Sequence, residues 1–323
     1  MQSVNNDIFN NIDFEKTALE LFHKQAESVE VYKTFIENLN IDSRSVDSIE
    51  KIPFLPVEFF KNFDVYCGEN QPEIIFTSSS TTNTGQSRHL VSSIELYKKA
   101  FINSFSHFFG DPQKYCFLFL LPSYLEREGS SLVFMAQELI NISSYKQSGF
   151  YLYDFQDLYN QLLENEKQKI PTILFGVTFA LLDFAEEYQI PLKSTIIIET
   201  GGMKGRKREI VREEVHQILS NAFGLKHIYS EYGMAELLSQ AYSKGDGLFS
   251  TPPWMRVLFY NTHNPLALSQ TATGGINIID LANKHSCAFI QTADIGRISS
   301  NNQFEVLGRL DYSEIRGCSL LAL

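Results

Sequence analysis

The first part of the chain carries apolar residues at helical spacing, which predicts that residues 14–40 are helical. The apolar stripe consists of Leu19, Phe22, Ala26, Val29 and Tyr32. Pro53 and Pro56 interrupt this pattern and lead into a short segment over residues 57–63. We therefore expect a helical cover over residues 1–70.

A strand, a long polar loop and a second helix are expected next. The strand is predicted over residues 73–76 and the loop over residues 77–88. The helix is expected to begin after the loop, because Ser92 and Glu95 have the spacing of a capping box. Its buried face is predicted to contain Ile94, Tyr97, Phe101, Phe105 and Phe108.

Short, nearly continuous apolar runs alternate with helical patterns in the middle of the chain. The runs cover residues 115–121, 149–153, 172–175, 194–198 and 227–230. Strands buried on both faces and separated by helices indicate an α/β core over residues 71–245 with a largely parallel sheet. From residue 246 to residue 317, turns separate short alternating segments, which predicts a small antiparallel β subdomain.

Composition narrows the classes of protein to consider. The chain has 323 residues, and its apolar fraction of 44% is ordinary for a soluble globular protein. The net charge of −11 gives no reason to expect a nucleic-acid partner. The longest apolar stretch, residues 115–121, is too short to span a membrane, and the N-terminus lacks the features of a secretory signal. Four widely spaced cysteines without a CxxC pair argue against zinc and disulfides, so a cytoplasmic protein is expected.

The loop over residues 77–88 is the first segment that could carry chemistry. Seven of the eight residues from Thr77 to Thr84 are Ser or Thr. Their hydroxyls and the backbone N–H groups could donate to phosphate oxygens, and Arg88 could add positive charge. The loop is not a Walker loop. Taken alone, it could equally be a polar surface loop.

Three further segments have the same ambiguity. Gly201 and Gly202 follow a predicted strand and would let the backbone approach a flat ligand, although helix-entry turns look the same. In the segment 229–236, a Tyr could stack on a base, Gly233 would shape a turn and Glu236 could hold Mg²⁺. Asp294 at a strand end could accept from ribose hydroxyls, and Arg309 could reach ribose or phosphate. A structural turn is the alternative for both.

Together, in this order and spacing, the four segments resemble the adenylate-forming superfamily of acyl-CoA synthetases, firefly luciferase and peptide-synthetase adenylation domains. The resemblance implies the fold of that superfamily's N-terminal domain, with ATP and Mg²⁺ as cofactors. It implies that the phosphates are held by Thr77, Ser78, Ser79, Ser80, Thr81, Thr82 and Arg88. The adenine would be contacted by Gly201, Gly202, Tyr232 and Gly233. Glu236 would hold the metal, Asp294 the ribose, and Arg309 with Asp311 would mark the hinge.

Within this superfamily the chain is similar to the acyl-protein synthetases of the bacterial luminescence fatty-acid reductase complex (LuxE family). The similar stretches, spread over residues 50–323, are residues 52–61, 87–89, 121–127, 130–132 and 316–320. Family chains usually continue past the hinge into a lid with a catalytic Lys, whereas this chain stops twelve residues after Asp311. One domain over residues 1–317 with a short tail over residues 318–323 is therefore expected.

The LuxE resemblance implies a reaction in two stages. A carboxylic acid, expected to be a fatty acid because aromatic residues are abundant, would be activated as acyl-AMP. The acyl group would then pass to Cys318, which matches the acceptor cysteine by position, and on to a reductase, a carrier protein or CoA. Direct transfer to CoA or a carrier is one alternative. The other is a non-catalytic scaffold, because Ser80 and Asn83 replace the glycines of the family loop and Ala235 replaces a Thr.

Overall fold

The computed structural model describes residues 8–78, 85–122, 129–152, 154–201, 210–299 and 303–310. Its helices are α1 (Phe14–Ser28), α2 (Glu30–Asn38), α3 (Phe59–Asn62), α4 (Ile94–Phe109), α5 (Ser131–Ile142), α6 (Phe155–Gln168), α7 (Thr178–Glu187) and α8 (Arg212–Phe223), with short 3-10 turns η1 (Ser43–Ser45), η2 (Ile49–Lys51) and η3 (Pro112–Lys114). Its strands are β1 (Leu55–Pro56), β2 (Ile74–Thr77), β3 (Arg88–Val91), β4 (Cys116–Leu120), β5 (Gly149–Phe150), β6 (Thr172–Val177), β7 (Thr195–Thr200), β8 (Tyr229–Tyr232), β9 (Ala241–Ser243), β10 (Phe249–Ser250), β11 (Met255–Asn261), β12 (Asn264–Leu268), β13 (Thr273–Asp280), β14 (Phe289–Ile298) and β15 (Phe304–Arg309).

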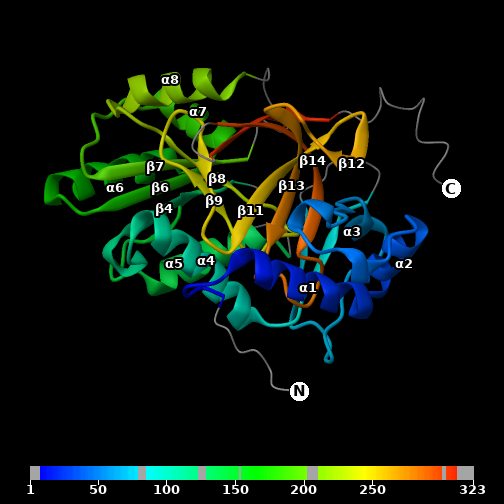
Figure 1. Ribbon diagram of the computed structural model, residues 1–323. Coiled ribbons are helices and arrows are strands. Elements are labelled where there is room, and N and C mark those ends of the chain that lie inside the picture. Colours follow the sequence, from blue (N-terminus) through cyan, green and yellow to red (C-terminus); the bar gives the residue numbers. More distant parts are fainter. Residues whose placement is uncertain are drawn as a thin grey trace.

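Most of the described strands belong to one continuous sheet with a parallel half and an antiparallel half (Figure 1). The order is β12-β11-β13-β14-β15-β10-β9-β8-β7-β6-β4-β5, and β1 pairs with β14. Strands β4 to β8 are parallel neighbours, whereas the pairs from β8–β9 to β11–β12 are antiparallel. The predicted α/β class with an antiparallel β region is therefore confirmed, and the two regions share one sheet.

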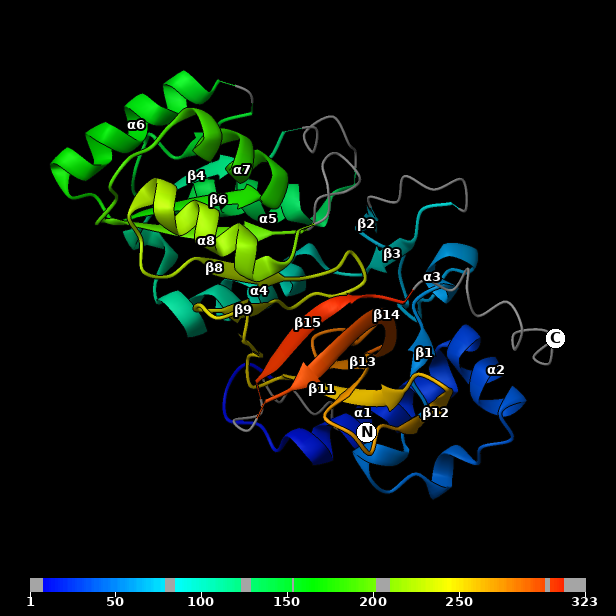
Figure 2. The ribbon, with the colours of Figure 1, turned by 90° about the horizontal axis from the view of Figure 1, so that it is seen from above.

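Helices cover both faces of the parallel half. Figures 1 and 2 show α7 and α8 on one face and α4 and α5 on the other. Every residue of β4 and β6 is buried. This two-sided burial is the reason that these strands read as continuous apolar runs.

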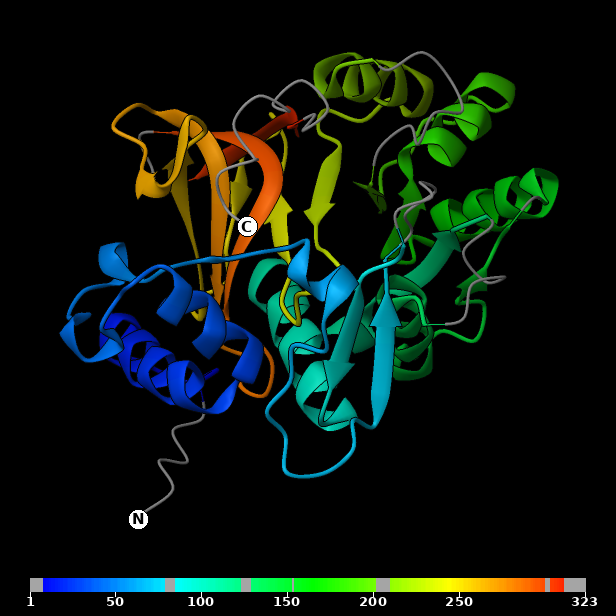
Figure 3. The same ribbon diagram turned by 90° about the vertical axis from the view of Figure 1, so that its right-hand side faces the viewer.

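The N-terminal helices pack against the antiparallel half (Figure 3). The rings of Phe22 and Tyr32 lie 5.9 and 6.2 Å from the ring of Phe289 in β14. The amide of Gln25 in α1 donates to the Asn283 carbonyl at 2.8 Å. Strand β1 then runs parallel to β14, with Leu55 opposite Ile290. The predicted helical cover thus packs against β14, which lies more than 200 positions later in the sequence.

Two local predictions are corrected by the structure. The stretch 14–40 forms two helices, because buried Val29 is extended, with φ −92° and ψ 99°. The bend lets both helices turn aromatic side chains toward the core. The helix cap is also one residue later than predicted: Ser93 accepts from the Leu96 amide at 3.2 Å. The carboxylate of Glu73 accepts from the Ile94 amide at 2.7 Å, which fixes Ile94 as the first helical residue.

Candidate functional site

Asp294 lies where the predicted 229–236 segment meets the predicted segment that contains Asp294 and Arg309. Its carboxylate is buried at the point where β14 pairs with β15, directly opposite Arg309. The Tyr232 hydroxyl, at the end of β8, donates to Asp294 Oδ2 at 2.7 Å. Arg309 Nε lies 3.3 Å from Asp294 Oδ1, and the arginine side chain is otherwise exposed. The structure therefore brings together residues that are 62 and 77 positions from the first of them, Tyr232.

Tyr232 is held on several sides. Its ring lies edge-on to the rings of Phe249 and Phe304, at 6.0 and 5.7 Å. Burial, followed by the negative charge of Asp294, raises the pKa of the Tyr232 hydroxyl well above its ordinary value. The hydroxyl therefore stays protonated and acts as a hydrogen-bond donor to Asp294.

The two predicted glycine turns differ in their surroundings. Gly201 follows β7 with φ +73°, and among the described residues no atom lies within 4 Å of the position that a Cβ would take. Open space and a left-handed backbone suit a turn that a ligand approaches closely. A Cβ at Gly233 would instead collide with the Glu231 carboxyl. Gly233 thus makes room for a neighbouring side chain. Gly202 lies outside the described residues.

Glu236 is a buried carboxyl with oxygen groups beside it. Burial raises its pKa, while Ser87, Arg309 and Lys61 act in the opposite direction. The buried Ser87 hydroxyl faces this carboxyl without meeting the geometry of a hydrogen bond. A carboxylate and a hydroxyl buried together fit the preference of Mg²⁺ for oxygen ligands. Within the described ranges, no group of three or more His, Cys, Asp or Glu residues is placed to bind a metal.

The predicted phosphate loop begins and ends on the β2–β3 hairpin, which is separate from the main sheet. Thr77 pairs with Arg88, and the Ser78 amide donates to the Ser87 carbonyl at 3.1 Å. The Arg88 side chain is about half exposed, and its guanidinium donates to Asp64 at 2.9 Å. Arg88 is therefore held at the surface. The remaining predicted loop residues, Ser79, Ser80, Thr81 and Thr82, lie outside the described part of the chain.

His89 is a buried residue of β3 whose contacts the sequence did not indicate. Its Nδ1 lies 2.8 Å from the Ala235 carbonyl and its Nε2 lies 3.0 Å from Asn283 Oδ1. The Asn283 amide in turn donates to the Glu236 carbonyl at 2.9 Å. Burial lowers the pKa of His89 to about 4, so the ring is neutral near neutral pH and donates to one of the two oxygens, that of Ala235 or that of Asn283. These contacts hold the backbone of Ala235 and Glu236 in place.

Glu199 forms a second network that sequence reasoning missed. The carboxylate accepts from Arg212 Nε at 3.1 Å and from the Thr178 hydroxyl at 2.8 Å, and His216 Nε2 lies 3.6 Å away. Burial alone would raise the pKa of Glu199, but these groups together with Ser230 lower it. Thr178 also donates to the Gly201 carbonyl at 2.9 Å, so this network anchors the glycine turn.

Glu231 lies on the neighbouring strand, where it accepts a short hydrogen bond from the Thr200 hydroxyl. Burial raises its pKa to about 7; Thr200 opposes this rise and the charge of Glu199 adds to it. In the sequence, Glu199 and Glu231 are each the only charged residue of their strand, which is the signal that could have identified them.

Two of the three described cysteines, Cys116 and Cys287, are poor nucleophiles. Cys67, Cys116 and Cys287 are free thiols, and the last two are buried. Burial raises the pKa of Cys116, and it raises the pKa of Cys287 to about 12. Since the thiolate is the reactive form, neither suits acyl transfer. Cys318 lies outside the described residues.

None of the helices in the described ranges is both long and apolar enough to cross a membrane.

Comparison with solved structures identifies proteins of similar fold. No family model and no curated protein matches the chain. ATP-bound MatB from Rhodopseudomonas palustris is similar in structure, with a TM-score of 0.56 at 14% identity over 73% of this chain and 47% of that chain. A 2-hydroxyisobutyryl-CoA ligase in the postadenylation state, in complex with R3-HIB-AMP, has a TM-score of 0.63 at 10% identity over 92% of this chain and 67% of that chain. The chain spans about half the length of MatB. Its described residues have the fold of the N-terminal domain of adenylate-forming enzymes.

Proposed function

We propose that this protein activates a carboxylic acid, a fatty acid in particular, as its acyl-adenylate with Mg-ATP. The observation that supports the proposal most is the contact of Tyr232 and Arg309 with the Asp294 carboxylate, at 2.7 and 3.3 Å. Tyr232 was assigned to the nucleotide from one segment, and Asp294 with Arg309 from another. A ribose that contacts all three residues would have to bind beside the Asp294 carboxylate.

The proposed reaction needs positioning more than acid–base chemistry. A carboxylate oxygen attacks the α-phosphorus of ATP, the bond to the bridging oxygen breaks, and pyrophosphate leaves. Asp294 accepts from the ribose hydroxyls, and Tyr232 holds that carboxylate in place. The open turn at Gly201 lets the backbone approach the adenine. Fixed partners of this kind lower the barrier by orientation and charge stabilisation.

The charge of the phosphates is met by the loop and by the metal site. Thr77, Ser78 and the loop that follows, with Arg88, hold the leaving pyrophosphate. Arg88 must exchange its ion pair with Asp64 for one with phosphate. Glu236 with the Ser87 hydroxyl would hold Mg²⁺, which when bound neutralises phosphate charge.

The second stage passes the acyl group to a thiol. The Cys318 thiolate attacks the acyl carbon, AMP leaves, and a thioester forms. A reductase, a carrier protein or CoA then takes the acyl group. The raised pKa values of Cys116 and Cys287 leave Cys318 as the better candidate than either of them.

Adenylation is tested by acid-dependent exchange of labelled pyrophosphate into ATP. Exchange should require Mg²⁺, and Glu236→Gln should lower it at least tenfold because the metal carboxylate is lost. Glu50→Gln, at an exposed position in η2, is the matched control and should exchange normally. Absence of exchange with every acid, together with absence of ATP binding in calorimetry, would establish the scaffold alternative.

Acyl transfer is tested with labelled acid and ATP. The protein should become labelled, and neutral hydroxylamine should release the label. Cys318→Ser should abolish labelling while pyrophosphate exchange continues, because adenylation comes first. Normal labelling of this variant would favour direct transfer to CoA or a carrier.

The acid class is tested by chain length. Residues 175–179 and Phe184, an apolar stretch that precedes the Gly201 turn, are buried in β6 and α7. Each buried methylene contributes about 0.8 kcal/mol, so affinity should rise with chain length until the pocket is full. A preference for acetate or an amino acid over dodecanoate contradicts the fatty-acid proposal.

A further inference from the structure

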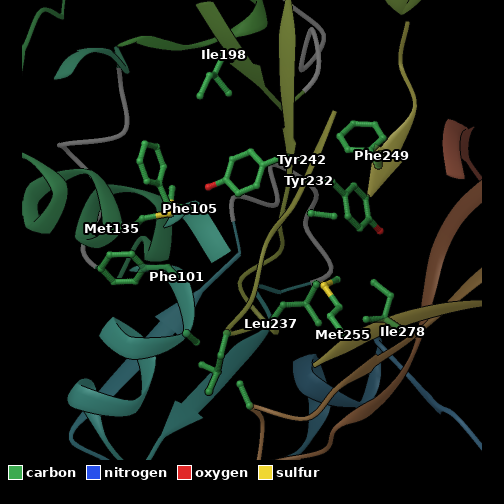
Figure 4. Close-up of a cluster of buried hydrophobic side chains, with 14 of the residues drawn as sticks. Phe101, Phe105, Met135, Ile198, Tyr232, Leu237, Tyr242, Phe249, Met255 and Ile278 are labelled. Atoms are coloured by element: carbon green, nitrogen blue, oxygen red, sulfur yellow. The ribbon is translucent and has the colours of Figure 1, made fainter. Parts of the chain in front are cut away.

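The face of β8 and β9 that is turned toward α4 carries buried polar side chains inside an apolar cluster. Glu231 in β8 lies directly opposite Tyr242 in β9. Gln240 is beside them, because a Cβ at Gly233 would contact both the Glu231 carboxyl and Gln240 Cγ. Glu231, Gln240 and Tyr242 are all more than nine-tenths buried. Figure 4 shows Tyr242 among the apolar side chains that surround it, which include Phe101, Phe105, Met135 and Ile198.

Two atoms of this group lack partners. Within the part of the chain that the structure describes, the Tyr242 hydroxyl and Gln240 Oε1 are buried without a hydrogen bond. The Gln240 amide nitrogen donates to the Leu238 carbonyl at 3.3 Å, which leaves the oxygen as the free end. Buried polar atoms without partners are rare, because each has lost its hydrogen bonds to water and gains no hydrogen bond in the protein to compensate. These two atoms therefore have hydrogen-bonding capacity that the described residues do not use.

The position of the group points to the acid rather than to the nucleotide. Neighbouring residues in a strand point to opposite faces. Tyr232 points toward Asp294, and Glu231 therefore points away from the proposed ribose site. The Thr200 hydroxyl joins Glu231 to the strand end just before the Gly201 turn. An acid activated beside that turn would extend its chain along the side of β8 on which Glu231 lies.

We propose that Glu231, Gln240 and Tyr242 form a subsite for a hydroxyl group on the chain of the acid, an inference that rests on the proposed function. Gln240 Oε1 can only accept, and the Tyr242 hydroxyl can donate or accept. A substrate hydroxyl both donates and accepts, so it satisfies both atoms. A plain alkyl chain leaves them unsatisfied. The substrate class is then a hydroxylated fatty acid.

The experiment compares pyrophosphate exchange for decanoic acid with exchange for its monohydroxy isomers. At least one isomer should exceed decanoic acid by roughly tenfold or more in kcat/KM, because a hydrogen bond that only one substrate can make decides the ratio. Tyr242→Phe and Gln240→Met should each reduce that ratio several-fold. In the absence of acid, Tyr242→Phe should not lower Tm, since the hydroxyl that it removes has no protein partner.

Tyr115→Phe is the matched control. The Tyr115 hydroxyl donates to the Phe109 carbonyl at 2.8 Å, so this variant should lower Tm and leave the substrate ratio unchanged. Decanoic acid exchanging as well as every isomer overturns the subsite alone. An unchanged ratio in both Tyr242→Phe and Gln240→Met also overturns it. No exchange with any acid overturns the proposed function, and the subsite with it.

Discussion

Glu199 and Glu231 are buried carboxyls on adjacent strands that lie in opposite surroundings. Glu199 faces α8, where Arg212 and His216 supply positive charge and Thr178 supplies a hydroxyl. Glu231 faces α4, where Thr200 is its hydrogen-bond donor and unpartnered polar atoms lie nearby. The pKa of Glu199 is lowered, whereas the pKa of Glu231 is raised to about 7.

This difference separates a structural polar group from one that is available to a ligand. A buried charge that serves the fold is paired on all sides, because an unpaired one costs several kcal/mol. The Glu199 network fits this description and anchors the Gly201 turn. The Glu231 side has hydrogen-bonding capacity that the described chain does not use. Three predictions test the comparison.

Removal of the cation from the Glu199 network should have the largest effect. Arg212→Met leaves a buried carboxylate without its ion pair and should lower the free energy of unfolding by about 3 kcal/mol or more. Urea unfolding measures this change. Arg297→Met removes the exposed ion pair with Glu305, at 2.9 Å, and should cost less than about 1 kcal/mol. Equal losses in the two variants would show that the Glu199 network is not structural.

The pH dependence of stability should identify Glu231. Its pKa is about 7 in the folded protein and close to the ordinary 4.5 when unfolded. The folded state therefore holds the extra proton between these values, and stability falls as pH rises from 4.5 to 7. In Glu231→Gln this contribution is absent. The stability difference between wild type and variant should shift by about 2 kcal/mol between pH 5 and pH 8 in urea unfolding. A constant difference would place the Glu231 pKa outside this window.

The turn that Glu199 anchors should show the smallest effect. Gly201→Ala places a side chain at φ +73° and should lower the free energy of unfolding by about 1 kcal/mol. Gly149→Ala also meets open space, but at a position without positive φ, and should change stability by less than about 0.5 kcal/mol. Thermal unfolding of both variants checks this. If Gly201→Ala is equally mild, the turn is free to adopt another backbone conformation.

The parallel half of the fold could be predicted from the sequence because two-sided burial produces continuous apolar runs. The division of the first helix could not, since Val29 fits the apolar stripe and only its packing makes it extended. Ser92 and Ser93 could each cap the next helix. The choice depends on Glu73, which lies on a different element.

The sequence indicated which segments belong to the candidate site, but it did not indicate which of their side chains touch one another. The resemblance assigned Tyr232 and Asp294 to one nucleotide, and Arg309 was expected to reach its ribose or phosphate, but the hydrogen bond between Tyr232 and Asp294 depends on the sheet. Glu199, Glu231 and His89 were missed for the same reason. Their partners come from α8, β7 and the Asn283 turn, and strand register alone decides which side chains share a face. The domain boundaries and the roles of the site residues stay predictions.

The pairing of β1 with β14 has a consequence for how the newly made protein acquires its structure. Leu55 and Ile290 are 235 positions apart, so a ribosome working at roughly 5–20 residues per second makes β14 about 10–50 s after β1. Until then Phe22 and Tyr32 lack the Phe289 ring against which they pack. Contacts between such distant positions form slowly. The N-terminal segment is therefore the part of the nascent chain that stays longest without its partners and is most open to chaperones or to association with other chains.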